Sequence, residues 1–267
     1  MQFDSLVSIL GNDKRMDYIA GYLYDKGFEI NREADKISQS DIVIIEPGSC
    51  IDIPKLLGCL KPGTKLFLPK INLTLEKLCS KWKIQVFDYF GSDYITYENA
   101  KLTALGIVRI AKGKNAVLEE SNCLLCGFGF CGKEIAKQLV NAHANVDVFV
   151  RRKDLRQQIE EYGCSGVLMS DIEKTSFDKY SYIFNTVPAL IFTSHLLAKF
   201  SNNVIIFDIA SLPGGVDDAY CNTHNIEVVH SLGIPGALYP KEAGMLVAKE
   251  IYNILYNVSD PICDYNK

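Results

Sequence analysis

Short apolar runs alternate with amphipathic segments along the first 98 residues of the chain. The apolar runs, which read as strands, cover residues 6–10, 41–45, 65–68 and 84–87, and segments with helical spacing cover residues 13–26, 52–60 and 73–81. Near-continuous apolar strands that alternate with helices indicate a parallel sheet covered on both faces. The pattern therefore predicts a first α/β domain over residues 1–98.

The same alternation returns later in the chain. Strands are expected at residues 123–126, 145–150, 180–184, 204–207 and 226–229, with helices at 133–142 and 154–162. These elements predict a second α/β domain over residues 121–240.

Two helical segments stand outside these repeats. Residues 99–112 form one amphipathic pattern, so residues 99–120 are expected to connect the domains and to form one wall of the cleft between them. A second helix is expected at residues 241–256, directly after Pro240. We expect residues 241–267 to pack back towards the N-terminal domain.

Composition narrows the class of protein. The chain has 267 residues, of which 48% are hydrophobic, and a net charge of −4 that argues against a nucleic-acid partner. Neither a membrane-length apolar run nor a secretory pattern is visible, so a cytoplasmic protein without a membrane partner is expected. The nine cysteines are scattered, which favours reduced thiols. Cys123 and Cys126 would point to opposite faces of a strand, so no metal site is expected.

A glycine motif marks the start of the second domain. Gly127, Gly129 and Gly132 form G-x-G-x-x-G between an expected strand and helix, the setting of a dinucleotide-binding turn. The first glycine permits the turn, the second lets pyrophosphate approach the backbone, and the third allows close packing of the helix. With Phe128, Phe130 and Cys131, the whole loop is expected to contact a cofactor. The alternative is a tight turn without a ligand.

Basic residues follow the next strand. Arg151 and Arg152 come directly after Val150, at the position where NAD sites carry an acidic residue and NADP sites an arginine. A guanidinium can hold a 2′-phosphate through paired hydrogen bonds. We therefore predict that the second domain is a doubly wound Rossmann domain and that it binds NADP. The alternative is that these arginines belong to a solvated basic loop.

Other strand ends carry loop residues suited to a site. Residues 185–188, 208–215 and 231–236 are rich in Gly, Pro, Asn, Ser and Thr, and Thr186, Val187 and Pro188 are expected beside the cofactor. In the first domain, Lys14 and Arg15 lie at the start of a helix, where a substrate carboxylate could dock. A helix cap with two solvated cations is the alternative interpretation.

At these positions the sequence resembles the A subunit of dipicolinate synthase, a sporulation enzyme. The similarity rests on residues 11–15, Asn99, Thr103, Ala104, Gly106, Gly127, Phe128, Gly129, Gly132, residues 185–190, residues 208–211, Pro213, Gly214, Gly215, Asp217, residues 233–236, Pro240, Lys241, Ala243 and Gly244.

The resemblance implies a reaction and partners. It implies oxidation of a dihydrodipicolinate-type intermediate to pyridine-2,6-dicarboxylate, with hydride passing to NADP. Lys241 is the first candidate for a substrate carboxylate or proton-transfer partner, with Arg15 also on the substrate, while Asn185 and Ser211 are candidates for orienting the ring or the nicotinamide amide. Lys241 could instead only cap a loop and Asn185 only satisfy a turn, and His230 stays outside this catalytic set. The resemblance also implies a flavoprotein-like B subunit and the mother-cell cytoplasm, and leaves a homo-oligomer open.

Three departures from the family pattern keep other functions open. Leu105 replaces a glutamate, Leu212 a lysine and Phe130 an arginine. One competitor is another NADP-dependent two-domain dehydrogenase of the shikimate or methylene-tetrahydrofolate type. The other is a cofactor-binding subunit that has lost catalysis or works only with a B subunit.

Overall fold

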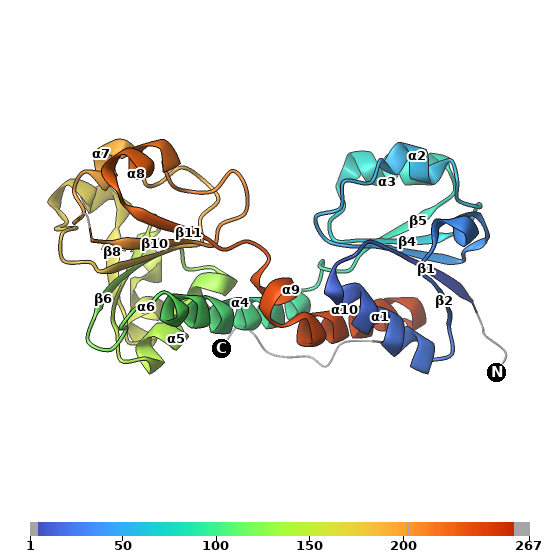
Figure 1. Cartoon of the computed structure of the whole chain (residues 1–267), viewed down its shortest axis with the longest axis horizontal. Coiled ribbons are helices and arrows are strands. Elements are labelled where there is room, and N and C mark those ends of the chain that lie inside the picture. Colours follow the sequence, from blue (N-terminus) through green and yellow to red (C-terminus); the bar gives the residue numbers. More distant parts are fainter. Residues whose placement is uncertain (1–4, 202, 259–267) are drawn as a thin grey trace. The chain divides into compact units, whose positions relative to one another are not determined.

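A computed structural model of the chain describes residues 5–201 and 203–258. The chain forms two compact units, unit 1 from Met1–Asn99 with Pro235–Lys267, and unit 2 from Ala100–Ile234 (Figure 1). Each unit contains one parallel sheet with helices between its strands. The predicted fold class of two α/β domains is therefore confirmed.

The sheet of unit 1 has the strand order β2-β1-β3-β4-β5. Its strands are β1 (Leu6–Leu10), β2 (Glu29–Asn31), β3 (Ile42–Ile45), β4 (Lys65–Leu68) and β5 (Gln85–Asp88). Strand β2 was not expected, because it is short and its two ends are polar. Its place depends on pairing with β1 and on a hydrogen bond of 2.9 Å from Asn31 Nδ2 to Ser8 Oγ.

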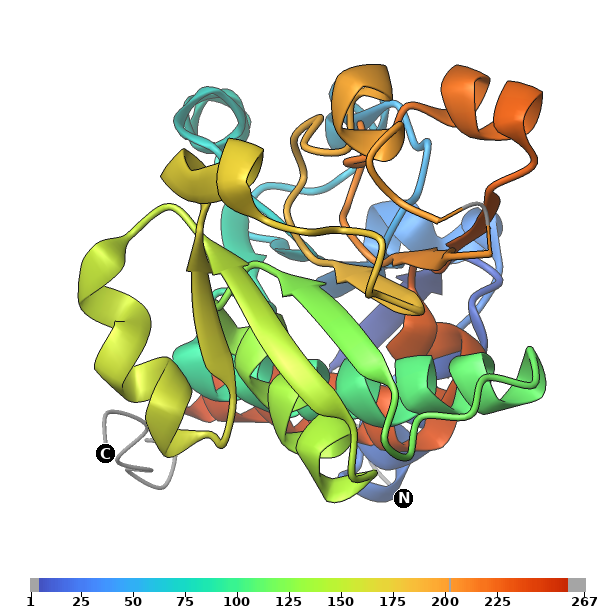
Figure 2. The same ribbon diagram turned by 90° about the vertical axis from the view of Figure 1, so that its left-hand side faces the viewer.

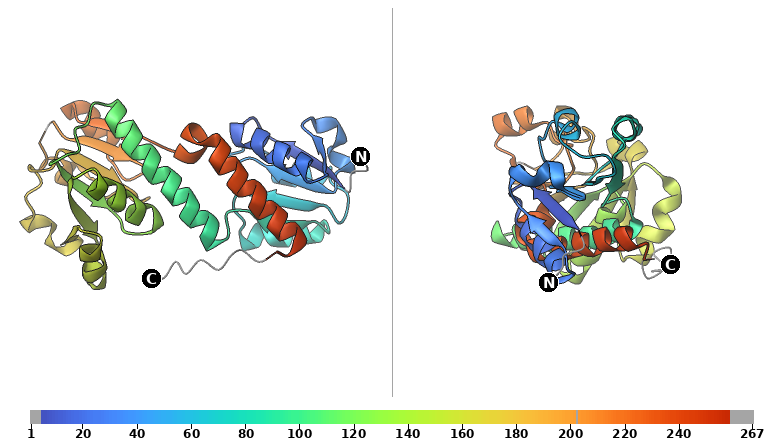
Figure 3. Two further views of the ribbon diagram at one scale, coloured as in Figure 1. Left: turned by 90° about the horizontal axis from the view of Figure 1, so that it is seen from below. Right: turned by 90° about the vertical axis from the view of Figure 1, so that its right-hand side faces the viewer.

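Helices cover both faces of this sheet (Figures 1 and 3). The helices of unit 1 are α1 (Lys14–Asp25), the 3-10 helix η1 (Ala34–Gln39), α2 (Ile53–Leu57), α3 (Leu73–Lys81) and α10 (Pro240–Tyr256). The short helix α9 (Ile234–Leu238) begins at the last residue of unit 2 and precedes α10. Side-chain caps explain several starts, since Asp13, Asp52 and Asn72 each accept a backbone N–H of the first turn.

Helix α10 belongs to the core of unit 1 although it lies near the end of the chain. Its residues Val247, Ala248 and Ile251 are buried together with Val7 and Ile9 of β1. The helix lies beside α1 on one face of the sheet (Figure 3). Unit 1 is thus built from two distant parts of the sequence.

The sheet of unit 2 has the order β11-β10-β9-β6-β7-β8, and all its neighbouring strands are parallel. The strands are β6 (Asn122–Cys126), β7 (Asn145–Val150), β8 (Ser165–Leu168), β9 (Tyr182–Asn185), β10 (Ile205–Asp208) and β11 (Glu227–His230). The chain order reverses between β6 and β9, which is the switch point of a Rossmann sheet.

Helices also lie on both faces of the second sheet (Figures 1 and 2). They are α4 (Asp93–Gly113), α5 (Phe130–Asn141), η2 (Lys153–Leu155), α6 (Arg156–Glu161), η3 (Met169–Lys174), α7 (Ser194–Leu197) and α8 (Asp218–His224).

Several boundaries differ from the sequence-based expectation. Helix α4 begins at Asp93, before the expected start at Asn99, and it continues from unit 1 into unit 2. The helix expected at residues 154–162 is split into η2 and α6. Strand β8 was missed because only Val167 and Leu168 give it an apolar signal.

Cysteines in the described part of the chain are all free. Cys123 and Cys126 are both fully buried in β6. None of the helices that the structure describes is both long enough and apolar enough to span a bilayer.

Candidate functional site

The turn between β6 and α5 has the close packing that the glycine motif predicts. Gly127 has a positive φ of 97°, and a Cβ atom there would lie 2.4 Å from Oγ1 of Thr186. A Cβ atom at Gly132 would lie 2.3 Å from the carbonyl oxygen of Gly127. Side chains at these two positions would push apart the turn, the helix and the neighbouring strand end.

Gly129 differs from these two glycines. It is the N-cap residue of α5, it gives the helix no side-chain cap, and no atom lies within 4 Å of the place of a Cβ. The N–H groups of the first turn of α5 therefore have no capping side chain from this residue, and they face a site where an anion is favoured by the helix dipole.

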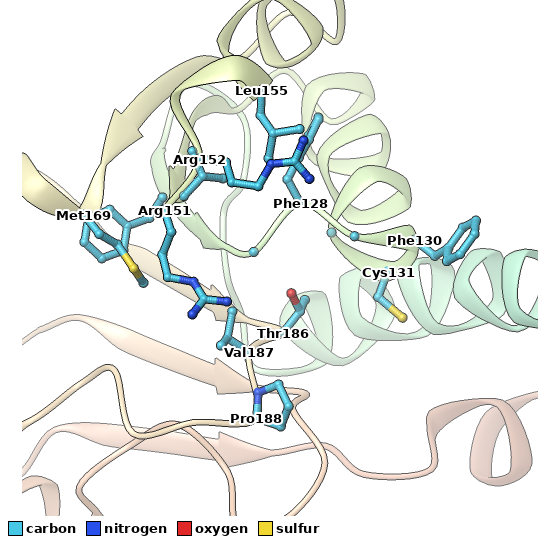
Figure 4. A pocket seen from close by; sticks show the side chains of 15 residues that line it. Phe128, Phe130, Cys131, Arg151, Arg152, Leu155, Met169, Thr186, Val187 and Pro188 are labelled. Carbon is cyan, nitrogen blue, oxygen red and sulfur yellow. The ribbon is translucent and has the colours of Figure 1, made fainter. Parts of the chain in front are cut away.

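A cavity of about 820 Å³ opens at this turn (Figure 4). Its wall includes every residue expected to bind the cofactor, namely Gly127, Phe128, Gly129, Phe130, Cys131, Gly132, Arg151, Arg152, Thr186, Val187 and Pro188. The sequence did not single out Phe149, Val150, Leu155 and Met169, which also line it. Apolar residues at strand and helix ends gave no signal that separates a cavity wall from core. The volume is in the usual range for ligand pockets.

The two arginines after β7 are in different states. Arg152 is paired with Asp154, with Nε 3.1 Å from Oδ1, and both side chains are exposed. Hydrogen bonding from Arg152 holds the pKa of Asp154 below its usual value. Arg151 makes no ion pair or hydrogen bond with any residue of the described ranges, and its guanidinium extends into the cavity towards Val187 (Figure 4). Arg151 is thus the arginine that is free to bind an anion.

A smaller cavity of about 240 Å³ adjoins the first one and shares Val150 and Arg152 with it. Lys153, Arg156 and Asp171 also line it. The sequence could have indicated this basic cavity, because residues 151–156 contain several cationic side chains.

Cys131 lines the main cavity and is partly buried. Burial raises the pKa of its thiol, so the reactive thiolate is disfavoured at neutral pH. The residue contributes shape to the loop rather than a nucleophile.

Asn185, at the end of β9, is fully buried. Its Nδ2 donates to the carbonyl oxygen of Val187 over 3.1 Å and to Oδ1 of Asp208 over 2.8 Å, and its Oδ1 accepts the N–H of Val187. The amide is therefore occupied within the protein. These hydrogen bonds are those of a residue that satisfies a turn, which was the alternative interpretation, and a direct contact of Asn185 with a ring or a nicotinamide stays a prediction.

Asp208 was not among the site residues expected from the sequence. Its carboxylate is 1% exposed and lies at the end of β10. The sequence signal was its position at the start of residues 208–215, one of the strand-end segments expected at a site. Ser211, in the loop that follows, is exposed, and its hydroxyl has no hydrogen bond to the described residues.

His230 lies next to Asp208 on the paired strand β11. Its Nδ1 is 3.6 Å from Oδ2 of Asp208, and its Nε2 is 2.8 Å from Oδ1 of Asp218. The imidazole therefore stands between a buried and an exposed carboxylate.

In unit 1, Arg15 is buried and already paired. Its Nε and Nη2 lie 2.9 Å and 2.6 Å from the two carboxylate oxygens of Asp13. A Cβ atom at Gly236 would lie 2.8 Å from Cζ of Arg15, so the guanidinium also packs against that backbone. The alternative interpretation expected both Lys14 and Arg15 to be solvated cations, but Arg15 is buried.

Lys14 and Lys241 are exposed, at the starts of α1 and α10. Neither has an ion pair with a residue that the structure describes. They remain the accessible cations among the unit 1 candidates.

Comparison with known proteins places the chain near one group. No protein-family model matches it. It is 27% identical over 188 residues to the A subunit of dipicolinate synthase from Bacillus subtilis, a match that covers 70% of this chain and 63% of that protein. The match thus spans less than two thirds of the relative's length. The resemblance that the motifs indicated is confirmed.

Solved structures show the same fold. The A subunit of dipicolinate synthase from Bacillus halodurans has a TM-score of 0.82 at 21% identity, covering 98% of this chain and all of that one. A transhydrogenase from Sinorhizobium meliloti has a TM-score of 0.69 at 13% identity, covering 94% of this chain and 93% of that one. The fold is therefore shared with a dipicolinate synthase subunit and with a transhydrogenase.

Proposed function

We propose that this protein is an NADP-dependent oxidoreductase that acts as the A subunit of a dipicolinate synthase. It would oxidise a dihydrodipicolinate-type intermediate to pyridine-2,6-dicarboxylate in the mother-cell cytoplasm during sporulation. The observation that carries the proposal is the cavity over the β6–α5 turn, which combines an uncapped helix N-terminus with the unpaired Arg151. The similarity to the A subunit of the Bacillus subtilis synthase supports the choice of substrate.

The residues of the cavity fit a dinucleotide. The open space at Gly129 leaves room for a pyrophosphate on the backbone of the first turn of α5. Arg151 would hold the 2′-phosphate, and Thr186, Val187 and Pro188 would flank the second half of the molecule. Bound NADP supplies the hydride acceptor.

The chain's own task in the reaction is to hold the ring and its two carboxylates. Aromatisation favours loss of hydride, so orientation matters more than activation. Lys241 and Lys14 are the exposed cations available to carboxylates, and Ser211 has a hydroxyl without a hydrogen bond to the described residues. Arg15, which is paired with Asp13, would act by fixing the end of β1 or through its remaining donors.

A partner-dependent version of this function has an observation in its favour. Leu212 is 80% exposed and Leu105 is 44% exposed, and both stand where the family pattern has a charged residue. Each of these two departures removes a charged side chain, which favours a chain that depends on a partner for part of its activity. A dipicolinate synthase B subunit is the proposed partner.

The first experiment is calorimetric titration of the purified chain with NADP and with NAD. The dihydrodipicolinate synthase reaction mixture is then added with NADP, and NADPH absorbance and pyridine-dicarboxylate are followed. Formation of both products establishes the oxidoreductase. Binding without turnover, followed by turnover once the B subunit is added, establishes the partner-dependent version.

Absence of binding to either dinucleotide contradicts the proposed function. A substrate panel that contains shikimate and methylene-tetrahydrofolate separates the competing dehydrogenases.

A further inference from the structure

The buried carboxylate of Asp208 connects two loops behind the cavity. Its Oδ1 accepts Nδ2 of Asn185 over 2.8 Å and the N–H of Ala210 over 3.4 Å, and its Oδ2 accepts the N–H of Gly215 over 3.2 Å. A buried carboxylate is costly unless such donors surround it. The arrangement therefore fixes Asn185, at the end of β9, relative to the loop that follows β10.

Asn185 passes this constraint to the cavity wall. One amide group binds both the N–H and the carbonyl oxygen of Val187, over 3.1 Å each. Val187 lies between Thr186 and Pro188, and all three line the cavity. The position of this wall segment thus depends on how Asn185 is held by Asp208.

Gly215 brings the second loop into direct contact with the same segment. A Cβ atom at this position would lie 2.2 Å from Nδ2 of Asn185 and 3.0 Å from the carbonyl oxygen of Val187. The carbonyl oxygen of Gly215 also accepts the N–H groups of Ile191 and Phe192. The loop after β10 is therefore a tight support for the segment after β9.

Topology determines which half of a dinucleotide this segment faces. In a Rossmann sheet the two halves of the cofactor lie on opposite sides of the switch point, which is between β6 and β9 here. Arg151, after β7, belongs to the adenosine side. The strand ends of β9 and β10 belong to the nicotinamide side.

We propose that Asp208, acting through Asn185, is a positioning residue for the nicotinamide half of the bound cofactor. This inference rests on the proposed function in that the ligand is a nicotinamide dinucleotide. It adds that one buried carboxylate sets the wall at Thr186, Val187 and Pro188 and has little influence on the adenosine half.

The test compares NADP with 2′,5′-ADP, which carries the adenosine half and the 2′-phosphate only. Asp208→Asn keeps the shape but places an NH₂ group against a donor, so we expect NADP affinity to fall about tenfold. Affinity for 2′,5′-ADP should change less than about twofold. Gly215→Ala should give the same pattern without any change of charge.

Asp218→Asn is the matched control. Asp218 is an exposed carboxylate that contacts the other nitrogen of His230 and makes no hydrogen bond to Asn185 or Val187 among the described residues. This variant should bind both ligands like the wild type. Equal weakening of NADP and 2′,5′-ADP by Asp208→Asn would mean a general structural role and would overturn the inference.

Hydrogen exchange gives a readout that needs no cofactor. The amides of Val187 and Gly215 should exchange slowly in the wild-type protein and faster in Asp208→Asn, whereas Asp218→Asn should leave them unchanged. If Asp208→Asn does not fold, the inference is tested by the ligand affinities of Gly215→Ala and by the amide exchange rates of the wild-type protein. Rapid exchange at both amides in the wild type overturns the inference. Failure of the proposed function is seen separately, as absence of wild-type binding.

Discussion

Side chains of one type have very different states in this protein. Arg151 is unpaired in the described structure, Arg152 is paired with an adjacent exposed carboxylate, and Arg15 is buried against Asp13. An exposed ion pair contributes little stability, but it does engage Nε and Nη2 of Arg152 with Asp154. The ability to hold a phosphate therefore belongs first to Arg151.

Arg151→Ala should weaken NADP binding by roughly 1–3 kcal/mol, which is about 5- to 150-fold, because a charge-assisted hydrogen bond to the 2′-phosphate is lost. Binding of NAD should change far less. Arg152→Ala is the matched comparison, since it removes the same side chain one position later, and its effect should be smaller. Calorimetry with both dinucleotides measures these differences. Equal loss of NADP and NAD affinity in Arg151→Ala would contradict the assignment of NADP.

At the scale of elements, the helix that follows the first strand of each sheet starts in a different way in the two units. Helix α1 is capped by the side chain of Asp13, whose own N–H donates to Glu46 over 2.7 Å. Helix α5 starts at Gly129 without a side-chain cap. Negative charge from the protein already stabilises the N-terminus of α1, whereas that of α5 is open to an anionic ligand. The same strand-to-helix turn is thus closed in unit 1 and open in unit 2.

The cap of α1 gives stability a dependence on pH. The hydrogen bonds from Arg15 lower the pKa of Asp13 despite partial burial. A lowered pKa contributes stability that is present above the unfolded value of about 3.9 and is lost as the pH falls through the folded value. Asp13→Asn keeps a capping side chain but removes the charge. Its melting temperature should be below that of the wild type at pH 7, and the difference should shrink below about pH 4.

Asp17→Asn provides the control for this experiment. Asp17 is an acidic residue in the same first turn, but its side chain is 73% exposed and its contact with Arg32 is 3.4 Å long. This variant should follow the wild-type pH profile. A parallel profile for Asp13→Asn as well would show that the Arg15 pair does not contribute to acid stability.

At the scale of the whole molecule, the core of unit 1 is completed by α10, the last helix in the part of the chain that the structure describes. Ile251 of α10 is fully buried in the same core as β1 and α1. Removing the Ile251 side chain would leave a cavity in the core of unit 1. The strands of this core lie far from Ile251 in the sequence.

Ile251→Ala should lower the free energy of unfolding of unit 1 by about 2–5 kcal/mol. Trp82 is the single tryptophan of the chain and lies in unit 1, so its fluorescence in a urea titration reports this unit. Lys249→Ala, an exposed position on the same helix, should unfold like the wild type. A change below about 0.5 kcal/mol for Ile251→Ala would contradict the role of α10 in this core.

The sequence alone determined the features that depend on neighbouring residues. Apolar runs and helical spacing are local patterns, so both α/β domains and most of their strands could be predicted. The glycine motif could be recognised because the turn that requires Gly127 and Gly132 is formed by residues that are close together in the sequence. All of the residues expected at the cofactor, from this loop and from the ends of β7 and β9, line one cavity.

Only the tertiary structure decided what depends on distant partners. Strand β2 is too short for a pattern and exists through its pairing with β1. Asn185 reads as a free polar residue, yet the carboxylate of Asp208, on the next strand of the sheet, occupies its amide. Likewise, Arg15 is paired because the carboxylate of Asp13 lies within hydrogen-bond distance, and Arg151 is unpaired because no carboxylate of the described residues does. Hydrogen-bond partners depend on how strands and helices pack together, and local sequence patterns do not reveal this packing.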